Sequence, residues 1–309
     1  MEFPETIFSY LTKIAQKDPD ARRSAVEDVL EKEKISYTLQ EDAASEKFPR
    51  GIRNYIFHTG GESDLPKKGE NLFCAHYDAV PGSYGANDNA AAVCILLALY
   101  REFREKNVSA SFALFDLEES GHEGAKLYRD IMKEGKVAVP ALALNLDVCG
   151  YGDSIVMCGK GHERKPAARP FVSKEVLKRH NAQLMHYLPE SDDIILRRAG
   201  IPSLSIAIVP RWDVQYLRSL GASGGGLLGR TPEFRMIEGE MEVSTTMHGG
   251  YRDDPKWIQP KAMQQVFDYL ADAQESPSAG TKFWSFRRNV RRSTDGRNEK
   301  DGLQQYLQT

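Results

Sequence analysis

The stretch from Asn71 to Tyr100, NLFCAHYDAVPGSYGANDNAAAVCILLALY, decides how the rest of the chain is interpreted. Its first part, residues 71–75, is short and apolar, which predicts a buried strand. Residues 79–87 carry Pro, Gly, Ser and Asn, which predicts an irregular loop. The apolar run at 89–104 is rich in Ala and Leu and is too long for a strand, so it predicts a largely buried helix.

The same alternation continues on both sides of this stretch. Upstream, the hydrophobic pattern predicts helices at 5–16 and 21–33 and a strand at 54–58. Downstream it predicts strands at 110–116, 141–148, 153–158, 183–187 and 203–209. The helices expected between and after them lie at 123–134, 170–180, 191–199 and 260–274. Buried strands that alternate with helices predict an α/β fold whose sheet is covered on both faces.

Two segments differ from this pattern. Residues 210–250 are long, Gly-rich and weakly patterned, with Gly-Ala-Ser-Gly-Gly-Gly-Leu-Leu-Gly at 221–229, and we expect a loop that covers the active site as a mobile wall. Residues 276–309 contain three aromatic residues and then many Arg, Lys, Asp and Gln. We therefore predict one catalytic domain over 1–275 and an extended, basic and polar C-terminal tail over 276–309.

Composition excludes some classes of partner. The 309 residues are 41% apolar and carry a net charge of −3, with 41 basic and 44 acidic side chains, so no strong field favours nucleic acid or a membrane. No apolar run approaches the roughly 18 residues of a membrane span, and no signal peptide is visible, so we expect a cytoplasmic protein. The sequence does not give the oligomeric state.

The cysteines also fit a cytoplasmic protein. None of them belongs to a Cys-x-x-Cys pair, and all stand in apolar runs: Cys74, Cys94, Cys149 and Cys158. They are predicted to be free, buried thiols in a reducing compartment.

Potential metal ligands stand where predicted elements begin or end: His76, Asp78, Asp88, Glu118, Glu119, Asp147 and His248. Taken singly, each has an ordinary explanation, such as a helix cap or an acidic first turn. Together they are informative, because ligands of such sheets bind outside the carboxyl ends of the strands and the predicted fold brings these residues to one edge. Imidazole and carboxylate without thiolate suit a catalytic zinc pair. Two Zn²⁺ ions would be balanced by Asp88, Glu119, Asp147 and a bridging hydroxide, which leaves Glu118 as a base.

Several motifs occur in a characteristic order: His76-x-Asp78, Gly85-Ala-Asn-Asp-Asn-Ala90, Asp116-Leu-Glu-Glu-x-Gly121, Asn145-Leu-Asp147, Ser191-Asp192 before Gly200-Ile-Pro202, and His248 before Asp253-Asp254. This series, which spans residues 54–274, resembles the bacterial di-zinc aminopeptidase family, a family that also contains glutaminyl cyclases. The resemblance implies a three-layer α/β/α zinc-exopeptidase fold with a mixed, mostly parallel central sheet. It implies a metal-dependent aminopeptidase that hydrolyses the N-terminal bond of a peptide or aminoacyl substrate with two zinc ions.

The resemblance also implies a role for each residue. Asp88 would bridge the two metals, with His76 and Asp147 at one and Glu119 and His248 at the other. Asp78 would accept the second ring N–H of His76 and so fix its tautomer. Glu118 would be the general base, taking a proton from water and later giving one to the leaving amine.

Two departures from the family pattern stand out. Ala91 and Ala92 replace a more usual Ser-Gly pair, and Met247 lacks a hydroxyl donor that some relatives carry before the last ligand. The alternative activity is glutaminyl cyclase, which would use a single zinc. The Gly85–Ala90 run and the intact Glu118-Glu119 pair favour the aminopeptidase. A non-catalytic binding module is disfavoured because such relatives lose ligands.

The other histidines are interpreted as surface or strand-end residues: His58, His122, His162, His180 and His186. Of these, His122 is the one nearest the candidate site in sequence.

Overall fold

The computed structural model describes residues 3–60, 68–222 and 231–276, and the apolar stretch at 71–100 lies at its centre. The strand expected at 71–75 is β3 (Asn71–His76), and its side chains after Asn71 are buried on both faces of the sheet. It lies between β4 (Ser111–Phe115) and β5 (Leu142–Leu146) and is parallel to both. Every residue of β4 and β5 is buried, as expected of central strands covered by helices.

The sheet has eight strands in the order β1-β2-β4-β3-β5-β8-β6-β7. Its parallel centre continues through β8 (Ser203–Val209), which pairs with β5. At one side β2 (Ile52–His58) and then β1 (Thr38–Asp42) are added antiparallel. At the other side β6 (Ser154–Cys158) runs antiparallel to β8, and β7 (Ala182–Leu184) runs parallel to β6. The prediction of a mixed, mostly parallel sheet is confirmed.

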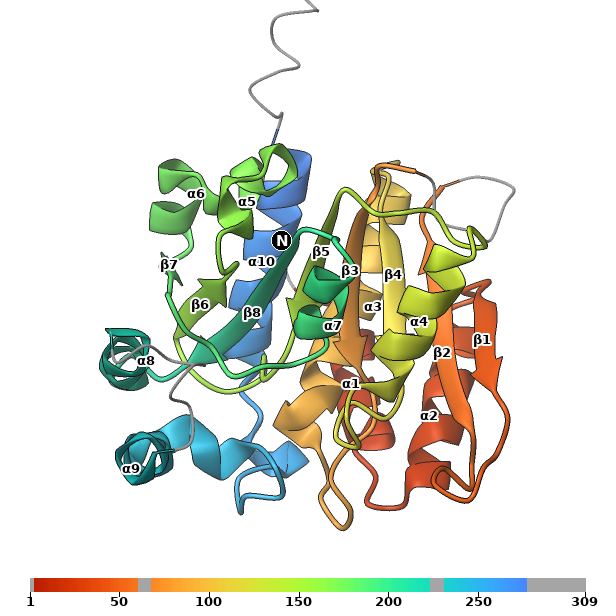
Figure 1. Ribbon diagram of the computed structural model, residues 1–309, viewed down its shortest axis with the longest axis horizontal. Coiled ribbons are helices and arrows are strands. Elements are labelled where there is room, and N and C mark those ends of the chain that lie inside the picture. The colour runs from red at the N-terminus through yellow and green to blue at the C-terminus, as the bar shows by residue number, and fades with distance from the viewer. Residues whose placement is uncertain (1–2, 61–67, 223–230, 277–309) are drawn as a thin grey trace, which may run out of the picture. The chain divides into compact units, whose positions relative to one another are not determined.

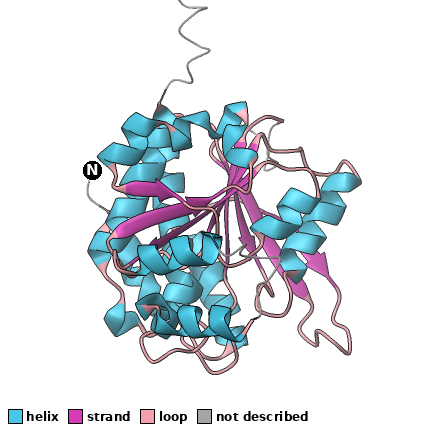
Figure 2. Cartoon of the chain, turned by 60° about the vertical axis from the view of Figure 1, so that its left-hand side comes forward, coloured by secondary structure: helices cyan, strands magenta, loops and turns pink. Residues whose placement is uncertain are grey.

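Helices cover both faces of this sheet (Figures 1 and 2). One face carries α1 (Glu5–Ile14), α2 (Pro19–Lys32), α3 (Ala91–Glu105), α5 (Arg169–Val172), α6 (Lys174–Arg179) and α10 (Pro260–Glu275). The other face carries α4 (Glu123–Lys133) and α7 (Asp193–Arg198), which pack in front of β3, β4 and β5 in Figure 1. The three-layer α/β/α arrangement is therefore confirmed.

Local sequence explains where several helices begin. α2 (Pro19–Lys32) starts after Asp18, whose carboxylate accepts the backbone N–H of Ala21 at 2.8 Å, and Pro19 occupies its first position. The single helix expected at 170–180 is divided into α5 and α6, because Ser173 between them has extended backbone and caps α6 by accepting from the N–H of Val176. α3 is buried over most of its length, as its Ala- and Leu-rich composition predicts.

The prediction of one long loop over 210–250 is wrong. The segment contains α8 (Asp213–Ala222), α9 (Pro232–Glu240) and a 3₁₀ turn at Glu242–Thr246, while residues 223–230 lie outside the described part of the chain. The carboxylate of Asp213 accepts the backbone N–H groups of Glu242 and Val243 at 3.0 and 2.8 Å, which joins the two ends of the segment. The glycine-rich run at 221–229 conceals the helical pattern on either side of it.

Other expectations have different outcomes. All four cysteines are free and buried, as predicted. Among the described residues, none of the helices is both long enough and apolar enough to cross a membrane. Residues 277–309 of the predicted tail lie outside the described part of the chain.

Candidate metal centre

The candidate ligands converge at the carboxyl end of the parallel strands. His76 is the last residue of β3, and Asp147 follows β5 directly. Glu118 and Glu119 come from the turn between β4 and α4, and Asp88 lies in a helical turn, Ala86–Ala90, that precedes α3. Parallel strands end at one edge of the sheet, so residues that follow different strands meet there.

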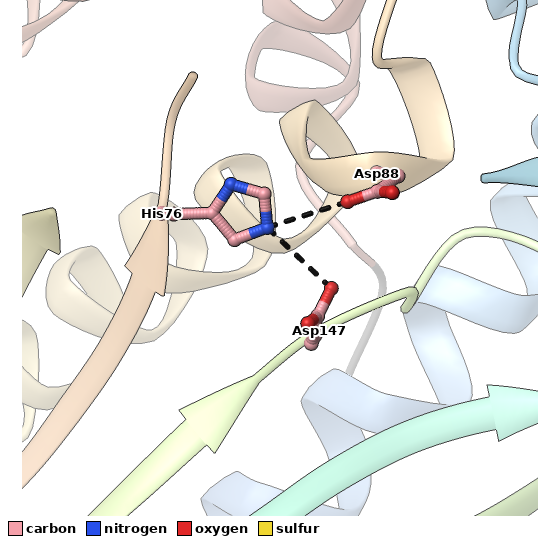
Figure 3. Close-up of side chains that lie close together, drawn as sticks. All are labelled: His76, Asp88 and Asp147. Carbon is pink, nitrogen blue, oxygen red and sulfur yellow. Dashed lines mark ion pairs between the residues drawn. The ribbon is translucent and has the colours of Figure 1, made fainter. Parts of the chain in front are cut away.

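The first group of candidate ligands consists of His76, Asp88 and Asp147 (Figure 3). His76 and Asp88 are buried, whereas Asp147 is partly exposed. The Nε2 atom of His76 lies 3.3 Å from Oδ1 of Asp88 and 3.6 Å from Oδ1 of Asp147. Two carboxylates, one from the turn before α3 and one from the end of β5, therefore face the same ring nitrogen.

The second group shares Asp88 with the first and adds Glu119 and His248. The Nε2 atom of His248 lies 3.8 Å from Oδ2 of Asp88 and 4.0 Å from Oε2 of Glu119. The side chain of His248 is 63% exposed, whereas those of Asp88 and Glu119 are 3% and 9% exposed. The centre is therefore open to solvent on the side of His248.

Asp78 connects the two groups. Its Oδ1 atom lies 3.2 Å from Nδ1 of His76, the ring nitrogen that points away from Asp88. The same carboxylate accepts the backbone N–H groups of Glu118 and Glu119 at 2.9 and 3.2 Å. Asp78 thus fixes both the ring of one ligand and the turn that carries another, which is the usual task of a residue behind a metal ligand.

Asp253 holds the loop that carries Asp88. Its carboxylate accepts the backbone N–H groups of Asn87 and Asp88 at 2.9 and 3.2 Å and the hydroxyl of Ser83 at 2.6 Å. Sequence reasoning found Asp253 only as part of a motif after His248 and gave it no task. Its contacts are made by backbone groups more than 160 positions away, which local sequence patterns do not reveal.

The electrostatics of the centre fit a bound cation. Burial alone would lower the pKa of His76, yet the carboxylates of Asp147, Asp78 and Asp88 raise it well above its usual value. Burial and then the charge of Asp88 raise the pKa of Glu119 to about 9. Nε2 of His76, Oε1 of Glu119 and Oδ1 of Asp147 are buried without a hydrogen-bond partner among the described residues. Buried polar atoms without a hydrogen bond are costly, and a metal ion bound by these side chains would offset that cost.

His122 does not behave as the sequence interpretation expected. Its side chain is 24% exposed and its Nδ1 atom lies 3.0 Å from Oε1 of Glu118 and 3.5 Å from Oδ1 of Asp192. Glu118, His122 and Asp192 thus form a third cluster next to the two ligand groups. The interpretation of His122 as an ordinary surface or strand-end residue is wrong. Tyr251 offers a hydroxyl in place of the one that Met247 lacks, but the sequence interpretation favours an ordinary packed tyrosine; its side chain is in fact 66% exposed.

A cavity of about 320 Å³ opens beside the centre, with Asp147 and His248 in its wall. Most of its other walls come from the segment that was expected to be a loop and from the end of the sheet. They are mainly apolar: Val148, Leu188, Ala207, Val209, Leu217, Leu220, Met241, Val243 and Met247. A small side chain attached to a molecule at the metal centre would enter an apolar space.

Known proteins resemble this chain in sequence and fold. Aminopeptidase YwaD from Bacillus subtilis is 35% identical over 78 residues, which cover 25% of this chain and 17% of that protein. The chain matches only 15% and 17% of the length of its curated relatives.

Among solved structures, a zinc-dependent exopeptidase from Parabacteroides distasonis has a TM-score of 0.64 at 15% identity, covering 90% of this chain and 99% of that one. The glutaminyl cyclase of Porphyromonas gingivalis has a TM-score of 0.61 at 14% identity, covering 88% and 97%. At these identities the likeness concerns the fold. The sequence pattern that defines peptidase family M28 matches residues 54–273, and the chain therefore belongs to that family.

Proposed function

We propose that the chain is a zinc-dependent aminopeptidase that hydrolyses the N-terminal bond of peptides with two metal ions. The observation that carries the proposal is the pair of ligand groups that share Asp88, one with His76 and Asp147 and one with Glu119 and His248. Each group offers three nitrogen or oxygen ligands and no sulfur, which leaves a position for water or substrate at each metal.

Zinc, when bound, polarises the scissile carbonyl and lowers the pKa of the attacking water. Glu118 is next to Glu119 of the second group and accepts a proton from that water while the oxygen of the water adds to the carbonyl carbon. The same carboxyl then gives a proton to the amine nitrogen as the carbon–nitrogen bond breaks. The surplus of carboxylates attracts the free ammonium group of the substrate, which restricts cleavage to the N-terminal residue. The apolar cavity beside Asp147 receives the side chain of that residue.

The alternative activity, cyclisation of N-terminal glutamine, needs one metal held by Asp88, Glu119 and His248. In that case Nε2 of His76 and Oδ1 of Asp147 would stay buried without a hydrogen bond among the described residues. These two atoms face each other at 3.6 Å without forming a hydrogen bond to one another, and a second metal ion bound between them accounts for that arrangement better.

The test combines metal content with substrate choice. Chelated protein is titrated with zinc, and hydrolysis of leucine p-nitroanilide, its N-acetylated form and a peptide that begins with glutamine is followed. We expect two zinc ions per chain at saturation, hydrolysis of the anilide and none of its acetylated form. One zinc together with release of ammonia from the glutamine peptide would instead establish the cyclase, and equal turnover of both anilides would exclude an aminopeptidase.

A further inference from the structure

Glu118, His122 and Asp192 form a cluster, but the reaction described above gives a role only to Glu118. The three residues come from two separate elements, because Asp192 immediately precedes α7 while the others belong to the turn before α4. The ring of His122 lies between the two carboxylates, at 3.0 Å from Glu118 and 3.5 Å from Asp192. One imidazole nitrogen, Nδ1, makes both approaches, which are ion-pair distances without the geometry of a hydrogen bond.

The backbone at His122 is set for this contact. His122 has a φ of +63°, in the left-handed region that favours glycine, and Leu117 on the other side of the glutamate pair has a φ of +53°. The carbonyl oxygen of Glu118 accepts the N–H groups of Gly121 and His122 at 2.9 and 2.8 Å, which closes the turn and brings the ring back over Glu118. A left-handed histidine costs about 1 kcal/mol, and such strain is found where surrounding contacts require it.

Asp192 is the fixed end of the cluster. It is fully buried, and neither carboxylate oxygen has a hydrogen bond within the described ranges. The segment is held by its neighbours, since Asn145 donates to the hydroxyl of Ser191 at 3.1 Å and Asp193 pairs with Arg197. A buried carboxylate without hydrogen bonds needs a cation nearby, and the ring of His122 is in position to be that cation.

Charge is consistent with this arrangement. The titratable groups that face the ring are Glu118 from its own turn and Asp192 from the start of α7. Burial alone would lower the pKa of His122, but the interactions with Asp192 and Glu118 raise it to about 10. Burial raises the pKa of Asp192 to about 7, although the interaction with His122 lowers it, so near neutral pH the cationic ring faces Glu118 and a carboxyl group, Asp192, that is partly ionised.

We propose that His122 is a positioning residue for Glu118: anchored by Asp192, its ring holds one oxygen of the Glu118 carboxylate and leaves the other oxygen for the reacting water. The assignment rests on the proposed role of Glu118 in hydrolysis. A third metal ion held by the same three residues is the competing explanation, and the experiment separates the two.

The experiment compares two neutral amides at position 122 in the zinc-loaded protein. In His122→Asn, the amide nitrogen takes the place of Nδ1, and Asn also tolerates the left-handed backbone. In His122→Gln, the amide lies one methylene farther out and cannot occupy that place. The exposed His186 provides the control His186→Asn. We expect His122→Gln to lower kcat by roughly 10- to 100-fold with little change in KM, His122→Asn to recover much of that loss, and the control to match wild type.

Two further measurements make the result decisive. Zinc content should stay the same in all variants, and loss of one equivalent from both His122 variants would establish a third metal instead. In nitrogen-15 NMR spectra the ring of His122 should be doubly protonated at pH 7 and should change in Asp192→Asn. A neutral ring, or equal kcat for the Asn and Gln variants, would overturn the positioning role. If wild type hydrolyses no substrate, the proposed function fails, while the NMR result still decides whether His122 is the cation between the carboxylates.

Discussion

Glu118 and Glu119 are adjacent residues with different surroundings. Oε2 of Glu119 approaches His248 at 4.0 Å, within the second ligand group, whereas Oε1 of Glu118 approaches His122. The carboxylate of Asp78 accepts the backbone N–H groups of both glutamates, so the backbone from which the two side chains extend is held in place. The two side chains leave one turn in different directions, which would suit the separate roles proposed for them, Glu119 as a ligand and Glu118 as the general base.

This difference predicts that substitutions of Glu118 and Glu119 affect activity and zinc content differently. Glu118→Gln keeps the size of the side chain and removes only the proton acceptor, so kcat should fall by roughly 10²–10⁴-fold while both zinc ions stay bound. Glu119→Gln replaces a charged ligand with a neutral one, so added zinc should restore part of its activity. Zinc content and kcat measured across a zinc titration separate the two variants, and metal loss from Glu118→Gln alone would reverse their roles.

Whether the sequence alone reveals a site residue depends on which part of the fold puts that residue in place. His76, Asp147 and the glutamate pair follow strands, and the edge rule of parallel sheets predicts that they meet. The cluster around His122 could not be found this way, because Asp192 lies 70 positions further along the chain and the left-handed backbone of His122 leaves no mark in the sequence.

At the scale of elements, α2 takes part in the centre although it lies outside the segment that matches the family. The side chain of Arg22 is buried and donates to the carbonyl oxygens of Tyr77 and Gly85 at 3.0 and 3.1 Å and to that of Tyr84. These carbonyls belong to the loop that joins His76 to Asp88. One guanidinium thus ties the N-terminal helices to the spacing of two ligands.

The contacts of Arg22 predict a cost for Arg22→Lys. An ammonium group cannot reproduce the planar set of donors, so several buried carbonyls would lose partners. We expect the free energy of unfolding to fall by about 2–4 kcal/mol and zinc affinity to fall with it. Urea denaturation and zinc titration measure the two effects, with Arg129→Lys as the control because Arg129 pairs with Asp130 at the surface. Unchanged zinc affinity would show that α2 does not set the geometry of the centre.

Most strands of the sheet could be predicted, including β6 and β7 at one margin, whereas β1 and the helices α8 and α9 could not. β3, β4 and β5 are short, buried and apolar, so pattern alone identifies them. β1 reads Thr-Leu-Gln-Glu-Asp and is mostly solvated, which leaves no hydrophobic signal. α8 and α9 are amphipathic and separated by a glycine-rich run, and their apolar sides are recognisable only once the cavity that they line is known.

α8 and the turn after α9 give the cavity its apolar walls, and this predicts substrate preference. Burial of a leucine side chain is worth about 1.5–3 kcal/mol, or roughly 10- to 200-fold in kcat/KM. Anilides of leucine, methionine and phenylalanine should therefore be hydrolysed faster than those of aspartate or lysine, with the alanine anilide as the reference for size. Arg235 and Glu238 also line the cavity, and a preference for a charged residue would show that they, rather than the apolar walls, select the substrate.

At the scale of the whole molecule, the metal centre joins parts of the chain that are far apart in sequence. Its candidate ligands extend from His76 to His248 and come from five places in the fold: the end of β3, the turn before α3, the turn after β4, the end of β5 and the loop before α10. Hydrogen bonds already connect some of these places, since Asp78 holds the turn after β4 and the backbone N–H of His248 donates to Asp88 at 3.1 Å. A bound metal ion would add a further link among all of them. Metal binding should therefore stabilise the native state as a whole rather than one loop.

This coupling predicts how thermal stability responds to zinc. A ligand that binds only the native state at 100 times its Kd stabilises it by about 2.7 kcal/mol, which corresponds to roughly 5–10 °C in Tm for a domain of this size. Chelation should lower Tm by that amount, and zinc should restore it. Asp88 belongs to both ligand groups, whereas Asp147 belongs to one. Asp88→Asn should therefore abolish the zinc response, Asp147→Asn should retain part of it, and Asp28→Asn, which changes an exposed carboxylate, should retain all of it. Equal responses in Asp88→Asn and Asp147→Asn would mean that the two groups do not share a ligand, and the dinuclear centre would have to be abandoned.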